Sequence, residues 1–335
     1  MTVGTAPASP LRPTLEVVDL KTYFHTKAGV VKAVDGVSFA LAPGEVLGLV
    51  GESGCGKSMT GFSIIGLIDP PGRVVSGAVL FGSSNLVGMP EEELRALRGN
   101  RISMIFQDPM MTLNPVLRVD TQMIEAVQAH RDCSRSAALG LARDALAQMG
   151  ISAPEQRLRC YPHELSGGMR QRVAIAIAFI NKPDLVIADE PTTALDVTIQ
   201  AQILHEAQEL CRRNGTAMIW ITHDLAVVSS LADRVAVMYA GMIVEQGRAS
   251  EVIRAPLHPY TKGLLGSVPS ANRPGARLAQ IPGMMPSSLD PAPGCRFLGR
   301  CSRAAAECST MPALTTPIPG REVRCWRPLT AGQQS

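Results

Sequence analysis

The sequence predicts an α/β fold built on a largely parallel sheet, with a mainly helical insert and a C-terminal module. Short apolar runs typical of strands alternate with segments of helical periodicity, which favours a sheet covered on both faces. A largely apolar run over residues 45–50 ends at Gly51, as expected for a buried central strand. The chain has 335 residues, and a single core stops growing near roughly 250–300 residues, so one large domain with a smaller addition is expected.

The predicted elements follow one another in a clear order. Short β-like runs at residues 15–20, 30–34 and 36–41 precede the central strand. Strand signals disappear over residues 108–165, where residues 134–149 have helical periodicity, so a mainly helical insert is expected. The alternation then returns, with a strand at 185–189, a helix at 198–213, a strand at 217–222 and a ribbon at 234–247 that turns at Gly241.

The two ends of the chain differ from its middle. Residues 1–13 have neither a basic start nor an apolar segment, so a short disordered tail is expected there and not a signal peptide. Beyond about residue 255, Pro and Gly become frequent and periodicity is lost, which predicts a C-terminal module over residues 255–335. The longest apolar run, residues 173–180, is far shorter than the roughly 20 residues of a membrane-spanning helix.

Charge and composition exclude two classes of protein. Apolar residues make up 46% of the chain and charged residues 18%, which is typical of a globular protein and not of a disordered one. Lys and Arg exceed Asp and Glu by only three (32 − 29), and no block of like charges occurs. Nucleic acid is therefore not expected as a partner.

Residues 51–58 match the G-x-x-x-x-G-K-[ST] pattern between the central strand and a predicted helix over residues 58–68. Glycines let such a loop direct its backbone N–H groups at phosphates, while Lys57 neutralises the β- and γ-phosphate oxygens and Ser58 ligates Mg²⁺. Cys55 is interpreted as a small spacer and not as a nucleophile. The predicted nucleotide-binding residues of this segment are Gly51, Ser53, Gly54, Cys55, Gly56, Lys57, Ser58 and Met59.

Two carboxylates follow the apolar run of residues 185–188. A buried acid at a strand end is costly unless it meets a cation, and Mg²⁺ beside the phosphate loop supplies one. Asp189 is therefore predicted to hold Mg²⁺, directly or through water, and Glu190 to orient or deprotonate the attacking water. Taken alone, the two acids could also be a helix cap or an ion pair.

Ser166, Gly167 and Gly168 stand at the start of a predicted helix, an arrangement that presents free N–H groups to an anion. With Leu165 and Gln171 they form the string Leu-Ser-Gly-Gly-x-x-Gln, which resembles the signature sequence of the ABC ATPases. This resemblance implies a P-loop NTPase domain over residues 14–254, with a mixed sheet, an antiparallel β subdomain and a helical subdomain at about 108–165. In that family the signature of one subunit closes over ATP held by another, so a second ATPase subunit is implied.

The resemblance covers about residues 15–250 and assigns further roles. It implies that Phe24 stacks on adenine, with Tyr23 as the alternative, although an aromatic at a strand end often serves packing alone. Gln107 resembles the family glutamine that contacts Mg²⁺ or water and links the core to the helical subdomain. Asp196 resembles the aspartate that acts across the dimer, and His223 resembles the histidine that contacts the γ-phosphate.

Four of the eight cysteines, Cys295, Cys301, Cys308 and Cys325, fall close to the C-terminus. Four thiolates in a short segment without a strong core suggest a metal staple, although their spacing names no metal. The segment around Cys295 and Cys301 resembles the C-terminal region of peptide-importer ATPases, which implies a [4Fe–4S] cluster. Zinc and unliganded thiols are the alternatives.

Residues 107–115 and 257–261 resemble the importers of dipeptides, oligopeptides and nickel. The function implied is ATP hydrolysis that powers peptide import, with nickel or another small solute, or a non-transport ABC ATPase, as alternatives. The implied partners are a second, non-identical ATPase subunit, two transmembrane permease subunits and an extracytoplasmic solute-binding protein. The implied location is the cytoplasmic face of the cell membrane, where the chain would be a peripheral protein.

Overall fold

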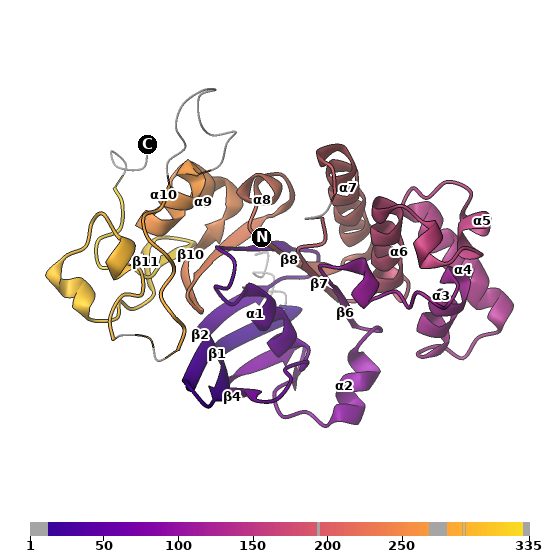
Figure 1. Cartoon of the computed structure of the whole chain (residues 1–335), viewed down its shortest axis with the longest axis horizontal. Helices are drawn as coiled ribbons and strands as arrows, with labels where there is room; N and C mark the ends of the chain where they lie inside the picture. The colour runs from indigo at the N-terminus through magenta and orange to yellow at the C-terminus, as the bar shows by residue number, and fades with distance from the viewer. Residues whose placement is uncertain (1–12, 193–194, 268–279, 290, 292, 331–335) are drawn as a thin grey trace, which may run out of the picture.

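The computed structural model describes residues 13–192, 195–267, 280–289, 291 and 293–330. Figure 1 shows two sheets in the middle of the molecule, a helical arm on one side and the C-terminal segment on the other. Except for Pro13, the tail predicted for residues 1–13 lies outside the described residues.

The main sheet contains eight strands. They lie side by side in the order β11 (Thr315–Ile318), β12 (Arg321–Val323), β10 (Met242–Arg248), β9 (Arg234–Tyr239), β3 (Val46–Val50), β8 (Ala217–Thr222), β7 (Leu185–Asp189) and β6 (Ile102–Ile105). The strands from β9 to β6 run parallel, whereas β9, β10, β12 and β11 pair antiparallel. The mixed α/β fold that the sequence predicts is therefore confirmed.

A second, antiparallel sheet consists of β2 (Gly29–Leu41), β1 (Leu15–Thr26), β4 (Gly72–Phe81) and β5 (Ser84–Asn85). The runs predicted at residues 30–34 and 36–41 belong to the single strand β2. Gly36, with a φ of 82°, lies where the pairing with β1 shifts register without ending. The left-handed conformation that glycine tolerates thus produces an irregularity inside one strand and not a break between two.

The two faces of the central strands enter different cores. Alternate residues of β7, such as Leu185 and Ile187, pack with the antiparallel sheet and with α1 (Lys57–Ile64). Their neighbours Val186 and Ala188 pack with the helical arm and with α7 (Val197–Asn214). Every residue of β3, β7 and β8 is buried, as the period of two requires when both faces are covered.

The helical arm corresponds to the predicted insert. It contains α3 (Val119–Gln128), α4 (Arg135–Gln148), α5 (Pro154–Leu158) and α6 (Gly167–Phe179). Helix α4 confirms the helix predicted at residues 134–149, and the Ser134 side chain caps it by accepting a hydrogen bond from the Ala137 N–H at 3.2 Å. Its buried side includes Ala138, Ala142 and Leu146.

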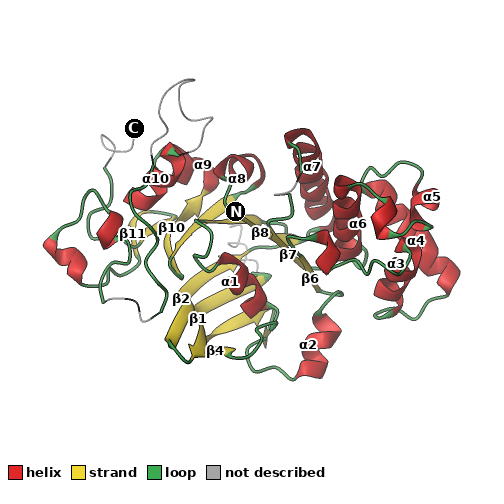
Figure 2. Cartoon of the chain, in the orientation of Figure 1, coloured by secondary structure: helices red, strands yellow, loops and turns green. Residues whose placement is uncertain are grey.

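The other helices connect the strands, and Figure 2 shows them around the sheets. They are α2 (Glu91–Leu97), α8 (Leu225–Leu231), α9 (Ala249–Arg254), α10 (Pro259–Gly266) and the 3₁₀ helices Pro109–Met111, Pro162–Glu164, Leu298–Arg300 and Ala306–Ser309. No helix among the described residues is both long and apolar enough to cross a membrane.

The C-terminal segment is joined to the main sheet. Strand β12 pairs antiparallel with β10, and the Arg321 guanidinium donates to the buried Glu245 carboxylate at 2.6 Å. The same carboxylate accepts the backbone N–H groups of Leu257 and His258 at 2.8 and 2.9 Å. A buried acid that receives three hydrogen bonds is well compensated, so this carboxylate fastens the segment to β10.

Candidate nucleotide-binding site

The phosphate loop, residues 51–58, joins the end of β3 to the start of α1. Gly56 precedes the helix with a φ of 106°, and a Cβ added there would come within 2.2 Å of the Ala33 carbonyl oxygen. Only glycine fits this position, because both the backbone conformation and the contact exclude a side chain. The buried thiol of Cys55 lies within the loop, and burial raises its pKa. Its protonated, buried state agrees with a spacer role.

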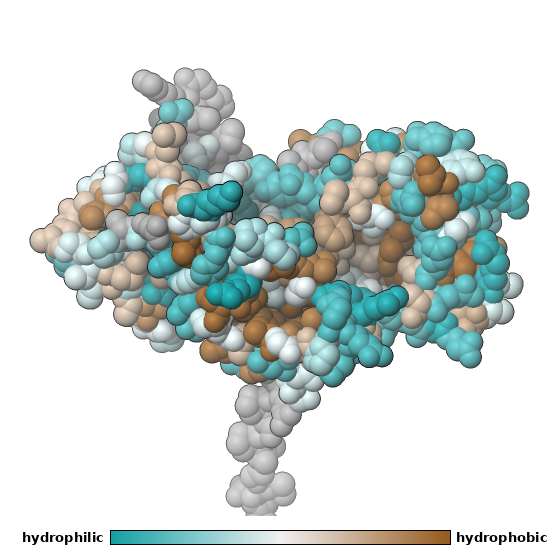
Figure 3. Space-filling model, turned by 60° about the horizontal axis from the view of Figure 1, so that its bottom comes forward, coloured by the Kyte–Doolittle hydropathy of each residue, from teal (hydrophilic) through white to brown (hydrophobic). Residues whose placement is uncertain are grey.

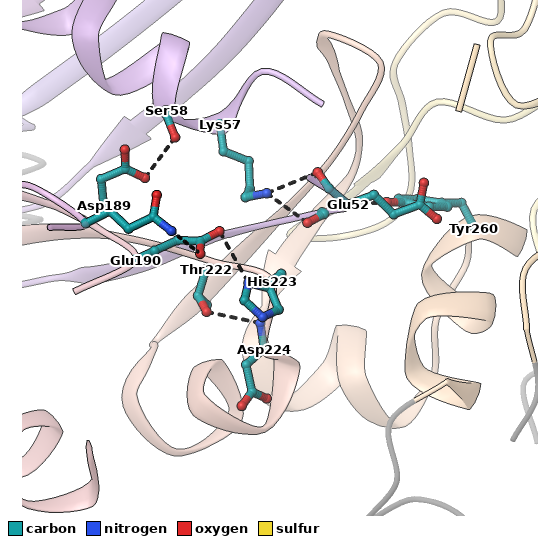
Figure 4. A network of polar contacts seen from close by, with 11 residues as sticks. Glu52, Lys57, Ser58, Asp189, Glu190, Thr222, His223, Asp224 and Tyr260 are labelled. Atoms are coloured by element: carbon teal, nitrogen blue, oxygen red, sulfur yellow. Dashed lines mark hydrogen bonds and ion pairs between the residues drawn. The ribbon is translucent and has the colours of Figure 1, made fainter. Parts of the chain in front are cut away.

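The Lys57 ammonium points back into the loop, as Figure 4 shows. It donates to the carbonyl oxygens of Gly51 and Glu52 at 2.9 and 3.1 Å. Lys57 is 4% exposed, so its charge is almost entirely out of water. A buried ammonium that meets only carbonyl oxygens in these contacts is suited to accept an anionic phosphate group.

Asp189 ends β7 directly opposite Ser58, whose hydroxyl donates to its carboxylate at 2.9 Å. Burial raises the pKa of the Asp189 carboxyl; the Ser58 hydrogen bond lowers it, and the charge of Glu190 raises it again. A hydroxyl and a buried carboxylate next to the phosphate loop form the oxygen donor set that Mg²⁺ prefers. The chain therefore fits the cation that the sequence predicts at Ser58 and Asp189.

Glu190 joins two other predicted catalytic residues. Its carboxylate accepts a hydrogen bond from the Gln107 amide at 3.4 Å and lies 3.3 Å from Nδ1 of His223. Gln107 follows β6 and His223 follows β8, so the carboxyl ends of parallel strands bring the three side chains together. Figure 4 shows Glu190 and His223 pointing toward one another. Glu190 adopts a φ of 44°, a strained conformation for a side-chain-bearing residue.

The signature residues lie elsewhere, at the start of α6 on the helical arm. Ser166 caps the helix by accepting a hydrogen bond from the Met169 N–H at 3.3 Å, and a Cβ added to Gly167 would meet nothing within 4 Å. A Cβ added to Gly168 would lie 3.1 Å from Ile199 of α7, which Asp196 caps through the Ile199 N–H at 3.0 Å. The signature and Asp196 therefore belong to one exposed surface.

The aromatic residues at the end of β1 make protein contacts. Phe24 packs so tightly on β4 that a Cβ added to Gly72 would come within 2.5 Å of its ring. The Tyr23 hydroxyl donates to the Asp35 carboxylate at 2.6 Å, and the Arg296 guanidinium pairs with the same carboxylate. Adenine stacking by Phe24, or by Tyr23, stays a prediction.

Three residues near the phosphate loop were missed by the sequence analysis. The backbone N–H of Glu52 donates to the Tyr260 hydroxyl at 2.9 Å, and Arg300 pairs with the Glu52 carboxylate at 2.7 Å. These contacts span 208 and 248 positions along the chain. A short sequence motif does not reveal contacts between residues this far apart in the chain, so these contacts are seen only in the structure.

The iron–sulfur prediction is wrong on these findings. Cys295, Cys301, Cys308 and Cys325 line one cavity of about 10 Å³, yet no group of three or more His, Cys, Asp or Glu residues in the described ranges is arranged to hold a metal. Burial raises the thiol pKa of Cys295 and Cys301 and raises that of Cys325 to about 11. Cys295 and Cys301 instead pack against the core around Phe297 as small apolar groups.

Comparison with known proteins agrees with this geometry. Residues 34–193 match the model of the ABC transporter family, and residues 244–308 match the oligopeptide/dipeptide transporter C-terminal region. A probable peptide ABC transporter ATP-binding protein of Sinorhizobium fredii is 50% identical over 93% of this chain and 94% of its own length. The dipeptide transport ATP-binding protein DppD of Bacillus subtilis is 49% identical, with the same coverage.

A third relative and two solved structures extend the comparison. The oligopeptide transport ATP-binding protein OppD of Salmonella typhimurium is 46% identical over 97% of each chain. CbiO1 of Clostridium perfringens, part of the ABC transporter complex CbiONQ, superposes with a TM-score of 0.61 at 27% identity, covering 72% of this chain and 90% of its own. The ATP-binding cassette MJ0796 gives a TM-score of 0.64 at 24% identity, covering 70% and 98%.

A P-loop beside a strand-end Asp–Glu pair, with an exposed signature helix, defines an ABC-type ATPase. This chain belongs to the family of ABC transporter ATP-binding subunits that includes those of dipeptide and oligopeptide transporters. ATP and Mg²⁺ are usual for ABC ATPases. The relatives' names describe ATP binding and peptide transport and mention no iron–sulfur group.

Proposed function

We propose that this chain hydrolyses ATP to power the uptake of dipeptides or oligopeptides. The observation that carries ATP hydrolysis is the convergence of Lys57, Ser58, Asp189 and Glu190 at one edge of the main sheet. The peptide cargo is supported by relatives that are named for dipeptide and oligopeptide transport and match nearly the whole chain. The match of residues 244–308 to the oligopeptide/dipeptide transporter C-terminal region supports the same cargo.

The proposed chemistry assigns one task to each side chain. Lys57 exchanges its carbonyl contacts for the phosphate oxygens of ATP. Ser58 and Asp189 hold Mg²⁺, which neutralises phosphate charge when bound. Glu190 orients the attacking water and accepts its proton, because it lies at the strand end next to the phosphate loop. His223, 3.3 Å from that carboxylate, fixes its orientation and contacts the terminal phosphate.

The phosphate loop is proposed to need a second ATPase subunit. Ser166 and Gly167 are exposed on the arm, Asp196 is exposed at the start of α7, and Val197, which follows it, is 81% exposed. An exposed helix start with small residues suits the γ-phosphate of ATP held by a neighbouring subunit. We assign the nucleotide-binding domain to residues 14–254 and propose that its mate is a homologous, non-identical subunit.

The hollow between the arm and the core is proposed as the contact with two transmembrane permease subunits. A cavity of about 250 Å³ opens there, lined by Phe106, Thr112 and Ile177 among others. Figure 3 shows apolar side chains gathered around the hollow on that face. Because Phe106 adjoins Gln107, a permease segment bound in this hollow would lie next to a residue of the proposed catalytic site, and a movement at one could displace the other. This arrangement implies a peripheral protein at the cytoplasmic membrane face, working with an extracytoplasmic solute-binding protein.

Purification from membranes tests this proposal. The tagged chain is expected to co-purify with a second ABC ATPase and two permease chains, and cells with Lys57→Ala should lose uptake of labelled dipeptide or oligopeptide. The Lys57→Ala chain must be present at the wild-type level for this comparison. Uptake unchanged by Lys57→Ala, or recovery of the chain without any membrane partner, would reject peptide transport.

A further inference from the structure

Glu52, the second residue of the phosphate loop, is held by the C-terminal part of the chain. Arg300 donates two parallel hydrogen bonds to its carboxylate, from Nη1 at 2.7 Å and from Nη2 at 2.9 Å. The hydroxyl of Tyr260 accepts the Glu52 backbone N–H at 2.9 Å, and Figure 4 shows the two residues side by side. The loop therefore depends on groups more than two hundred positions away for its second residue.

The guanidinium of Arg300 is fixed on every side. Its Nε donates to the Pro282 carbonyl at 2.9 Å, and Nη1 also lies 3.4 Å from the Tyr239 hydroxyl. The ring of Tyr239 lies under the guanidinium, 5.8 Å from centroid to Cζ. The Arg300 side chain is only 8% exposed. A planar group held this way makes a two-bond contact that Lys could not reproduce.

Glu52 also contacts Lys57, the predicted phosphate-binding lysine. Its carbonyl oxygen accepts from the Lys57 ammonium at 3.1 Å, so Arg300 and Lys57 hold the same residue from its two ends. The Glu52 carboxylate would also repel the polyphosphate of ATP if its charge were not compensated. Arg300 compensates this charge in a site largely withdrawn from water, where such a pair is weakly screened.

We propose that Arg300 is a positioning residue for ATP binding, which shapes the phosphate loop and neutralises Glu52 so that Lys57 and the loop accept the polyphosphate. This inference rests on the proposed ATPase function and adds a regulatory consequence. Because Arg300 ends the 3₁₀ helix Leu298–Arg300, any displacement of that C-terminal turn weakens ATP binding. The C-terminal segment thereby becomes part of the nucleotide site.

Equilibrium binding of a fluorescent ATP analogue with Mg²⁺ to the full chain tests this inference. Arg300→Met should weaken binding roughly tenfold, the change that about 1.4 kcal/mol produces. The double variant Glu52→Gln/Arg300→Met should recover most of the affinity, because it removes the uncompensated charge. A purely structural loss in the segment would not be rescued by this second change.

Arg327→Met is the matched control, because Arg327 pairs with Glu307 at 3.9 Å in the same segment and is half exposed. Its affinity should match the wild type. If Arg300→Met does not melt cooperatively, Arg300→Lys replaces it and should still weaken binding. Wild-type affinity in the Arg300 variant, or a double variant as weak as the single one, overturns the inference. A wild-type chain that binds no nucleotide refutes the proposed function instead.

Discussion

The phosphate loop and the signature surface are the two regions in which this chain carries phosphate-binding motifs, and they are built differently. Around the loop, Lys57, Ser58 and Asp189 are drawn inward and bonded to one another or to backbone carbonyls. On the arm, Ser166 and Gly167 are exposed, and a side chain added at Gly167 would meet only open space. The loop half of the proposed ATP site is therefore preformed, whereas the signature half is an exposed surface that is free to meet the second subunit we propose.

The largest expected effect lies on the loop side. Glu190→Gln should lower ATP turnover by about 100-fold or more, because the amide cannot accept the proton of the attacking water. Nucleotide binding should be retained, since Gln107 and His223 still find an oxygen at that position. Steady-state turnover and equilibrium binding, measured on the same preparation, separate the two effects. If the variant turned over ATP at the wild-type rate, Glu190 would not take part in hydrolysis.

A smaller effect is expected on the arm side. Gly167→Gln should lower turnover about tenfold or more in the assembled transporter, because the added side chain occupies the surface meant for the neighbouring ATP. ATP binding to the single chain should not change. Gly140→Gln in α4 is the control, because a Cβ there also meets nothing within 4 Å. Equal turnover in the two variants would show that the signature surface is not used.

The smallest effect concerns folding stability. Burial raises the pKa of Asp189, so its ionised form costs stability: the contribution of this group to stability is greatest below the ordinary pKa of an Asp carboxyl and is lost as pH rises through the raised pKa. Asp189→Asn should therefore raise the melting temperature of the nucleotide-free chain at neutral pH while Mg²⁺-dependent ATP binding weakens. Asp196→Asn keeps its helix cap at the exposed surface and should melt like the wild type. A lower melting temperature for Asp189→Asn would contradict this reading.

Local patterns predicted the strands that position the candidate site. The strands predicted at residues 185–189 and 217–222 have the same bounds in the structure. A continuous apolar run between polar turns marks both ends of a buried strand clearly. Parallel pairing of these strands then brings Glu190 and His223 together. Glu190 and His223 are each positioned by the end of a short strand, and the apolar run of such a strand can be recognised in the sequence.

Contacts between distant segments could not be predicted. Tyr260 and Arg300 reach Glu52 across 208 and 248 positions of the chain, and this proximity arises from the way the C-terminal segment packs beside the phosphate loop. The cysteine spacing indicated a metal site, but spacing carries no information on burial, which raises the pKa of Cys325 to about 11. Strand β2 likewise appeared as two runs, because the irregularity at Gly36 resembles a break in the sequence pattern.

The most direct test of the proposed ATP site between two subunits is a sedimentation experiment. The Glu190→Gln chain is mixed with the ATPase subunit that co-purifies with it, and the particle mass is measured with and without ATP and Mg²⁺. We expect the two chains to sediment as one particle with ATP and separately without it. Gly167→Gln, added to the Glu190→Gln chain, should prevent the association, and Gly140→Gln should not. Masses that are the same with and without nucleotide would contradict an ATP site shared between two subunits.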